Sequence, residues 1–403
     1  MVSYSEAYKI IRDEVQKLKL HTEEVDLLNS LNRILAEDVY ADTNLPPFDN
    51  SAMDGYTVKF SPSRKQWKMI GEISAGNFNI LTLDEDSAVL IMTGSKLPAN
   101  TSAVIPVEDV IAENGYVKLA DGKSIKENQH IRYKGGDLTK GVLALERNQV
   151  ITSNKISLLG ACGKARVKVY RKLKFGVLAT GDELVDISSR IFDDKIRGTN
   201  LYSIISAVTE FNMEAVNFGF VKDDKEHIRE KLSEAFDSDI DILLTTGGVS
   251  VGKYDYLKEL LIELGTDIKF WKVKIKPGKP LIFGVVKKDG RIKFVVGLPG
   301  NPVSSYVNFM VFIKPAVQEL FGIKDDKTVK AELTESVSKN DDKRNFLRGY
   351  LEFNLKKGQY FVRASEAQSS ADMTRLANAN CLIVIEEKRI NPQKGEEVQC
   401  III

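Results

Sequence analysis

The sequence is poor in residues that bind metals through sulfur or imidazole, with three cysteines and three histidines among 403 residues. Cys162, Cys381 and Cys400 lie far apart, without the paired spacing of a zinc site or of a disulfide framework. The histidines, at positions 21, 130 and 227, are equally isolated, so we expect each to pack or to lie on the surface. This composition argues against a zinc centre and a disulfide scaffold, and it favours a protein of a reducing compartment.

Net charge is also nearly absent, because 57 lysine and arginine residues balance 56 aspartate and glutamate residues. No bulk field favours nucleic acid or an acidic membrane, so any affinity for anions has to come from local clusters. No apolar run approaches the ~20 residues that a membrane span needs, and the first residues show no basic and apolar leader. We therefore expect a soluble, cytoplasmic protein that binds neither nucleic acid nor membrane.

The order of periodic segments predicts several domains. Ser3 and Glu6 form a capping-box signature at the start of a helix, and a second apolar pattern runs from Leu27 to about Ala36. Short β-favouring runs follow between residues 56 and 145, and they resume beyond Asp325. Between residues 172 and 321, strands alternate with helices, which predicts a three-layer α/β domain with a mostly parallel sheet.

From these patterns we expect four domains. The first is a discontinuous helical domain and the second a mostly-β domain inserted into it. The third is the α/β domain, and the fourth is a small β-barrel-like C-terminal domain. Their expected bounds are residues 1–45 with 139–170, 46–138, 171–322 and 323–403. Ligands of such α/β sheets bind at the carboxyl ends of the strands, so the loops at those ends are the candidate sites.

The first candidate loop contains Thr246, Gly247, Gly248 and Ser250 between a buried strand and a helix. Glycines let backbone amides turn inward, and the helix start adds a positive dipole end, so the loop suits a phosphate or another oxyanion. Asp255 follows in the first helical turn, where it could hold a cation against that phosphate. The alternative role of Asp255 is to complement the helix dipole.

The second candidate loop runs from Lys276 to Pro280 and places Lys276 and Lys279 on a backbone stiffened by two prolines. Stiffening matters because ordering a free lysine costs up to ~2 kcal/mol. A solvated charge run is the alternative, but proline on both sides of Gly278-Lys279 favours an anion site.

The third candidate loop contains Pro299, Gly300, Asn301 and, one turn into the next helix, Ser304. Asn301 is a favourable N-cap and Pro302 a favourable first helical residue, so local structure explains both. Local structure does not explain the preceding Pro-Gly pair or the hydroxyls of the first turn, which suit an oxyanion.

Carboxylates gather in other loops. Asp54 ends a proline-rich segment that begins at Leu45, Asp137 follows Arg132 by five residues, and Glu183 follows a predicted strand. Each carboxylate could be a turn residue. Together they suggest a magnesium-assisted site that a nucleotide phosphate would complete.

Taken in order along the chain, these segments resemble the molybdopterin molybdenumtransferase family, which includes MoeA and the E domain of gephyrin. The resemblance covers most of the chain. Its matching stretches are residues 45–58, 92–94 with 97–98 and 104–109, 132 with 136–137, 179–184, 200, 246–256, 276–281, 297–304 and 370–385.

The resemblance implies that the chain binds adenylylated molybdopterin, delivers molybdate or tungstate to its dithiolene and releases AMP, with Mg²⁺ as cofactor. It implies catalytic roles for Asp54, Asp137, Glu183 and Asp255, of which Asp54, Glu183 and Asp255 would hold the metal. It assigns the oxyanion to Lys276 and Lys279, to which we add Arg132. The substrate and nucleotide would bind to Thr93, Thr246, Gly247, Gly248, Ser250, Pro299, Gly300, Asn301 and Ser304.

The resemblance further implies a homodimer, formed through the helical domain, with an active site shared between protomers. The adenylyltransferase that supplies the substrate and the molybdoenzymes that accept the product are the expected partners. One alternative is a molybdopterin adenylyltransferase-like enzyme, but that would carry Gly-Gly-Thr-Gly where this chain has Gly248-Val249-Ser250. The other is a non-catalytic scaffold like gephyrin, which the retained carboxylates and lysines disfavour.

Overall fold

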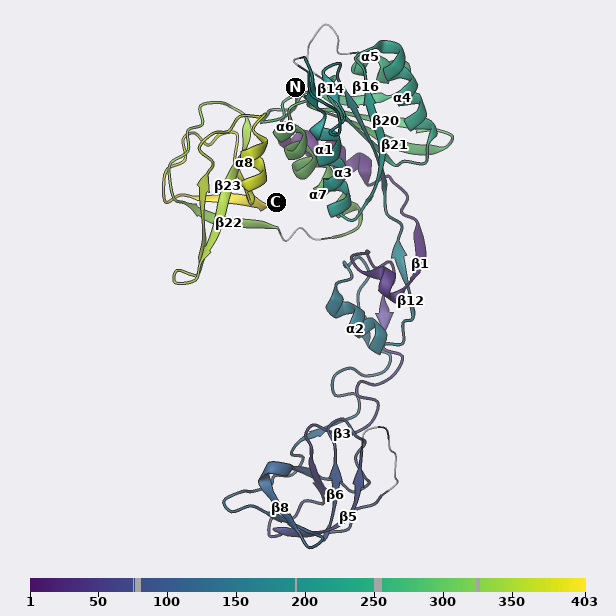
Figure 1. Ribbon diagram of the computed structural model, residues 1–403, viewed down its shortest axis with the longest axis vertical. Coiled ribbons are helices and arrows are strands. Elements are labelled where there is room, and N and C mark those ends of the chain that lie inside the picture. The colour runs from purple at the N-terminus through teal and green to yellow at the C-terminus, as the bar shows by residue number, and fades with distance from the viewer. Residues whose placement is uncertain (75, 77–80, 193, 250–255, 324–326) are drawn as a thin grey trace. The chain divides into compact units, whose positions relative to one another are not determined.

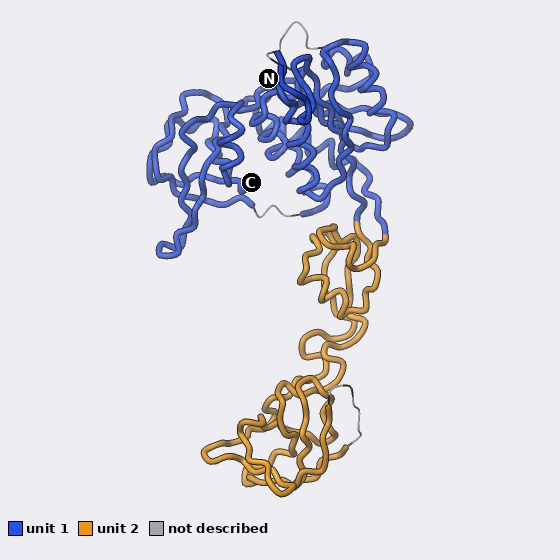
Figure 2. The backbone as a smooth tube through the Cα atoms, viewed as in Figure 1, with its two compact units in different colours: residues 1–23, 170–403 blue, residues 24–169 orange. Residues whose placement is uncertain are grey.

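The computed structural model describes residues 1–403 except 75, 77–80, 193, 250–255 and 324–326. The chain forms two compact units (Figure 2). Unit 1 consists of Met1–Glu23 and Tyr170–Ile403, and unit 2 of Glu24–Val169. In the described part of the chain, no helix is long and apolar enough to cross a membrane.

A six-stranded sheet forms the centre of unit 1. Its order is β16-β13-β17-β21-β20-β18, in which the first four strands are mutually parallel and β20 runs antiparallel to both of its neighbours, β21 and β18. The strands are β13 (Lys174–Thr180), β16 (Glu214–Val221), β17 (Ile242–Thr246), β18 (Asp267–Trp271), β20 (Ile282–Lys288) and β21 (Arg291–Leu298). The predicted mostly parallel α/β domain is thereby confirmed. The antiparallel edge was not predicted.

Helices cover both faces of this sheet (Figure 1). On one face, α4 (Lys225–Asp237) and α5 (Leu257–Glu263) share a core with the strands. On the other, α3 (Thr199–Glu210) packs on β13 and β16 and contacts α6 (Pro302–Asn308). A π-helical segment, η3 (Phe309–Ile313), joins α6 to α7 (Lys314–Leu320), so a single helical stretch follows the third candidate loop.

The N-terminal helix α1 (Tyr4–Val15) belongs to unit 1 and packs against α7. Its capping box is confirmed, since Ser3 and Glu6 exchange side-chain to backbone hydrogen bonds. The second apolar pattern forms only one turn of 3-10 helix, η1 (Leu27–Ser30), within unit 2.

Unit 2 contains a six-stranded sheet in the order β7-β4-β6-β5-β9-β8. The strands are β4 (Gly55–Val58), β5 (Gln66–Ile73), β6 (Ser87–Ile91), β7 (Ala103–Pro106), β8 (Val110–Glu113) and β9 (Tyr116–Leu119), and η2 (Val107–Asp109) follows β7. Shorter strands pair as β3 (Asn50–Ser51) with β10 (Ile131–Arg132), β2 (Val39–Tyr40) with β11 (Leu143–Leu145), and β1 (Thr22–Asp26) with β12 (Arg166–Tyr170). The helix α2 (Ser153–Ala161) packs on a small separate core.

The C-terminal strands close into a five-stranded barrel, because β23 pairs with both β24 and β25. The strands are β22 (Thr328–Leu333), β23 (Arg344–Asn354), β24 (Gln359–Ala364), β25 (Cys381–Ile385) and β26 (Glu397–Ile402), with α8 (Met373–Asn378) before β25. The short β19 (Ile275–Lys276) pairs with β23 and so joins the lysine loop to the barrel.

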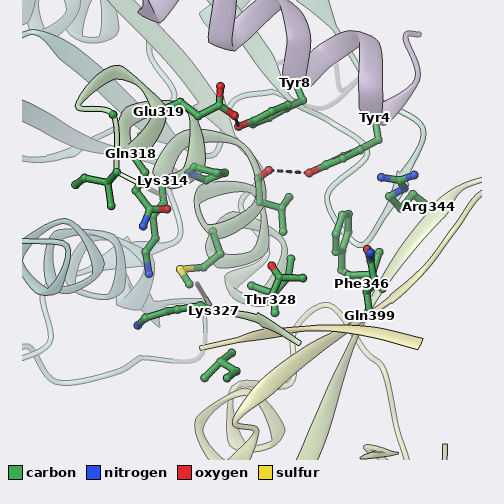
Figure 3. A pocket seen from close by; sticks show the side chains of 18 residues that line it. Tyr4, Tyr8, Lys314, Gln318, Glu319, Lys327, Thr328, Arg344, Phe346 and Gln399 are labelled. Carbon is green, nitrogen blue, oxygen red and sulfur yellow. Dashed lines mark hydrogen bonds between the residues drawn. The ribbon is translucent and has the colours of Figure 1, made fainter. Parts of the chain in front are cut away.

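Aromatic contacts fix the barrel against α1 (Figure 3). The ring of Tyr4 lies 5.4 Å from that of Phe346 and 4.6 Å from the guanidinium of Arg344, both on β23. On its other side Tyr4 donates a hydrogen bond to the carbonyl of Val311 at 3.1 Å. Such aromatic and cation–π contacts resist sliding as well as separation. The barrel and the α/β sheet both belong to unit 1.

Candidate active site

A pocket of about 780 Å³ lies at the carboxyl edge of the central sheet. The parallel register aligns Ala179 with Thr246 and Thr246 with Leu298, so β13, β17 and β21 end side by side. The loops after these three strands line the pocket. They contribute predicted residues of three loops, namely Glu183, Thr246, Gly247, Gly248, Pro299, Gly300, Asn301 and Ser304.

The first residue of the loop after β17, Gly247, can only be a glycine. Gly247 has φ +93°, and a Cβ on it would lie 2.4 Å from the carbonyl oxygen of Thr180. Its N–H donates to the carbonyl of Leu298 at 3.1 Å, which ties the loop to the end of β21. Gly248 also has a positive φ, +65°. The turn therefore packs its backbone against Thr180, where a side chain would clash, and lines the pocket with main-chain atoms.

Two buried polar atoms of the pocket lining lack partners in the described structure. Asn200 on α3 donates from Nδ2 to the carbonyl of Gly300 at 2.6 Å, which leaves its Oδ1 as an unpaired acceptor. The hydroxyl of Thr180, at the end of β13, is likewise buried without a partner among the described residues. Because unpaired buried polar atoms are costly, both atoms suit hydrogen bonds with a bound ligand.

The loop after β13 carries exposed carboxylates. Glu183 lines the pocket, and its backbone carbonyl accepts a hydrogen bond from Ile196 at 2.8 Å, within the short ribbon of β14 (Leu184–Val185) and β15 (Ile196–Arg197). Asp186 follows, and it accepts hydrogen bonds from Ser188 and from the hydroxyl of Tyr202 on α3. The Ser188 hydroxyl, then Tyr202, lower the pKa of Asp186 to about 2.

The C-terminal barrel also contributes to the pocket. Ala371 and Met373 line it, and the carbonyl of Ser370 accepts a hydrogen bond from the N–H of Val303 at the start of α6. Arg348 on β23, almost wholly buried, anchors this segment by donating to the carbonyls of Ala367 and Asp372 at 3.0 and 2.9 Å. Residues 370–385 belong to the family resemblance, but no role in the site was predicted for them from the sequence.

The lysine loop adjoins the pocket through Pro280, which lines it. Gly278 has φ +94°, and the buried Asn308 of α6 donates to its carbonyl at 3.1 Å. Lys276 lies 3.7 Å from Asp341 of the barrel, whereas Lys279 is exposed and has no ion pair with any described carboxylate. The structure thus keeps the two lysines on one braced loop, outside the pocket lining itself.

Unit 2 brings together four of the predicted residues. Thr93 donates to Asp54 from its hydroxyl and its N–H, both at 2.7 Å, and these bonds lower the pKa of Asp54. On the paired strands β3 and β10, Asn50 faces Arg132, and Arg132 forms an ion pair with Asp137 at 2.5 Å. The side chains of Asp54, Thr93, Arg132 and Asp137 are thus exposed and held in two pairs.

Two predicted residues, Ser250 and Asp255, lie outside the described residues. Among the residues that are described, no group of three or more histidine, cysteine, aspartate or glutamate side chains is arranged to hold a metal ion.

Family models match nearly the whole chain. Residues 2–163 match the MoeA N-terminal region (domain I and II), residues 176–319 a probable molybdopterin binding domain, and residues 330–403 the MoeA C-terminal region (domain IV). The chain is 37% identical over 383 residues to a protein of Haemophilus influenzae named molybdopterin molybdenumtransferase, a match that covers 94% of this chain and 93% of that protein. The chain belongs to the MoeA family.

Further relatives agree with this assignment. A molybdopterin molybdenumtransferase of Staphylococcus aureus is 33% identical over 370 residues, which cover 90% of this chain and 86% of that protein. The crystal structure of a molybdopterin biosynthesis MoeA protein from Pyrococcus horikoshii matches over the full length of both chains, with a TM-score of 0.84 and 28% identity. This match includes the α/β sheet, the barrel and unit 2.

Proposed function

We propose that this chain inserts molybdate or tungstate into adenylylated molybdopterin and releases AMP. As a member of the MoeA family it is an enzyme of molybdenum-cofactor biosynthesis that acts by metal insertion. The observation that carries the more specific proposal is the pocket at the carboxyl edge, where three strand-end loops and two unpaired polar atoms surround about 780 Å³.

In this proposal the backbone binds the phosphate groups of the substrate. The amide of Gly248 supplies an N–H donor, since that of Gly247 is bonded to Leu298, and the start of the α6–α7 helical stretch at Asn301 supplies a positive dipole end. The buried hydroxyl of Ser304 lines the same wall. Asn200 and Thr180 then hydrogen-bond the polar edge of the substrate, which orients it without adding charge.

The oxyanion site is assigned to Lys276 and Lys279, with Arg132 as a further cation. Lys279 has no described carboxylate partner, so its charge remains available for a dianion. The contact between Asn308 and Gly278 holds the loop, which reduces the entropy lost when the anion binds.

A magnesium ion fits this donor set when phosphate oxygens and water complete its shell, because Mg²⁺ in proteins commonly uses only one or two carboxylates. Glu183 and Asp54 are exposed carboxylates that could serve, with Asp255 as a third from the sequence. When bound, the ion would neutralise charge on the phosphates. Release of AMP adds the elements of water across the bond to the adenylyl group, and Asp137 is a candidate to position that water.

The direct test is incubation of the purified protein with adenylylated molybdopterin, magnesium and each oxyanion in turn. We expect AMP and metallated pterin to form together, and Glu183→Gln to retain the fold while it slows AMP release at least about 100-fold. An adenylyltransferase-like enzyme would instead form the adenylylated pterin from ATP. A scaffold would yield neither product, and either result would reject the proposal.

We also propose a homodimer whose active site is shared between protomers. In this proposal residues 1–45 and 139–170 form the dimerising domain, into which residues 46–138 are inserted. Residues 171–322 and 323–403 form the other two domains. Asp54 belongs to unit 2 and Glu183 to unit 1. If one protomer's Asp54 serves its partner's pocket, inactive Asp54→Asn and Glu183→Gln homodimers should regain activity after subunit exchange, because one site of each heterodimer carries neither lesion. A site within one chain would show no recovery.

The cytoplasmic setting and the remaining partners are part of the same proposal. The substrate would come from an adenylyltransferase, and the product would pass to apo-molybdoenzymes. A pull-down with the adenylyltransferase, made with and without substrate, would test the first of these contacts.

A further inference from the structure

A second pocket lies at the opposite edge of the central sheet, where β13, β17 and β21 begin. It has a volume of about 720 Å³ and is bordered by Ile240 and Ile292 and by the segment that follows α1. Among its described lining residues, six basic side chains oppose two aspartates, Asp239 and Asp241. The basic residues are Lys17, Lys19, Arg171, Lys174, Arg291 and Lys293.

The two aspartates are already paired within the fold. Arg171 donates to both carboxylate oxygens of Asp241, at 2.9 and 3.0 Å, and the N–H of Lys174 donates to the same carboxylate at 2.8 Å. The ammonium of Lys174 lies 2.6 Å from Asp239. These contacts tie the strand entries together and have a structural role. Lys17 is likewise paired, with Glu14 at 2.8 Å, so that Lys19, Arg291 and Lys293 are the lining cations without a described ion pair.

Lys293 is the least satisfied of these cations. It is buried, with 4% of its surface exposed, and its ammonium donates to the carbonyl of Ser238 at the end of α4. An ammonium has three donors, and an interior charge needs either a counter-charge or a full set of hydrogen bonds. The hydrogen bond that caps α4 uses one of the three donors of the Lys293 ammonium. It does not account for the other donors or for the positive charge.

Two neighbouring cations add to the positive charge of the pocket. Arg291 and Lys19 are exposed, and neither has a described carboxylate within ion-pair distance. Burial, followed by the nearby charge of Arg291, lowers the pKa of Lys293. Like charges held together in this way repel each other, and a bound anion would remove that repulsion.

We propose that this basic pocket binds a tetrahedral dianion, either a free oxyanion or the phosphate group of a small ester. Among its described lining residues there is no tyrosine, tryptophan or phenylalanine on which a nucleobase could stack. The anionic group, contacted by Lys293 at the base and by Arg291 and Lys19 at the rim, is the part of the ligand that the pocket recognises. This site is separate from the carboxyl-edge pocket and does not depend on the reaction proposed there.

Isothermal titration of the full chain with inorganic phosphate tests the proposal. Arg291→Gln and Lys293→Met should each weaken phosphate binding about tenfold or more, the effect expected when a charge-assisted contact is lost. The matched control is Lys287→Gln, on the neighbouring strand β20, because Lys287 is exposed and does not line the pocket. The control should bind phosphate within about twofold of the parent, the range left to a long-range charge effect.

The ligand series then distinguishes the two sources of the anion. Tighter binding of glycerol 3-phosphate than of phosphate or tungstate would identify an ester, and equal or weaker binding a free oxyanion. Unchanged affinity in Arg291→Gln, whose exposed side chain is not needed for folding, would overturn the proposal. Equal weakening in Lys287→Gln would overturn it too, since that result would show only a general effect of charge.

Discussion

The two edges of the central sheet bind or balance charge by different means. At the carboxyl edge the pocket is lined by glycine turns, hydroxyls and an amide, and α6 begins there at Asn301. At the amino edge the lining is dominated by lysine and arginine, and α4 ends there at Ser238. Helix starts carry a positive dipole end and helix ends a negative one. Backbone can therefore hold an anion at the first edge, whereas side-chain cations are needed at the second.

The carboxylates of the two edges differ accordingly. Asp186, after β13, is held by the neutral donors of Ser188 and Tyr202. Asp241, before β17, is held by the guanidinium of Arg171. Salt screens the attraction between ions much more than a bond between an ion and a neutral donor. The comparison thus predicts that substitutions at the carboxyl edge alter catalysis and that those at the amino edge alter salt-dependent stability.

The largest effect is expected for Gly247→Ala, which places a Cβ 2.4 Å from the carbonyl oxygen of Thr180 in a backbone of φ +93°. Strain and overpacking each cost about 1–3 kcal/mol, enough to displace the turn from the phosphate. We expect AMP release to fall at least about 100-fold. Gly265→Ala is the matched control, because Gly265 has φ +81° but open space around its Cβ position. Equal loss in both variants would show that strain alone is responsible.

The next effect is expected for Lys279→Ala, which removes the exposed cation of the lysine loop. Loss of one charge-assisted contact costs about 1.5–3 kcal/mol, so the molybdate concentration needed should rise about 10–150-fold. Nucleotide affinity should change little, because the glycine loops are untouched. The measurement is the dependence of metallated pterin on molybdate concentration, with Lys287→Gln as a charge-matched control. An unchanged molybdate dependence would remove Lys279 from the oxyanion site.

At the amino edge we expect a change in stability instead. Asp241→Asn weakens the contact with Arg171 and leaves a partly buried guanidinium without its counter-charge. The free energy of unfolding in urea should fall by about 1–3 kcal/mol at low salt and by less at high salt. Activity at saturating substrate should remain near that of the parent. A loss that is independent of salt would show that the hydrogen bond to Lys174, and not the ion pair, is what matters.

The parts of the site that depend on local structure could be predicted from the sequence. The turns at Gly247 and Pro299 and the helix start at Asn301 are set by residues a few positions apart. The hydrogen bond from Asn200 to Gly300 and the contact of Ser370 with Val303 could not, because they join segments that meet only after the sheet and the barrel have formed. The antiparallel pairing of β18 and β20 was not predicted for a related reason, because their short apolar runs resemble those of any buried strand.

The basic pocket was missed in the same way. Lys17, Arg171 and Arg291 lie far apart in the sequence, and the near-zero net charge does not indicate that they form a basic cluster. Strand pairing brings Arg171 and Arg291 together, because the entries of β13, β17 and β21 are neighbours in the sheet, and Lys17 joins them from the segment after α1. Long-range pairing of strands is therefore the information that a single sequence did not supply.

The smallest effect is expected for Ser188→Ala. The Ser188 hydroxyl is the main cause of the low pKa of Asp186, about 2 against an ordinary value of 3.8. A depressed carboxyl pKa stabilises the fold above the unfolded value and ceases to do so as pH falls through the folded value. The variant should therefore unfold at a slightly lower temperature than the parent near neutral pH, and the difference should shrink as pH falls from about 4 towards 2. Ser189→Ala is the control, because Ser189 reaches Asp186 only through a backbone hydrogen bond. A difference that persists unchanged at low pH would assign the effect of Ser188 to packing, and the neutral donors of the carboxyl edge would then have no electrostatic role at this position.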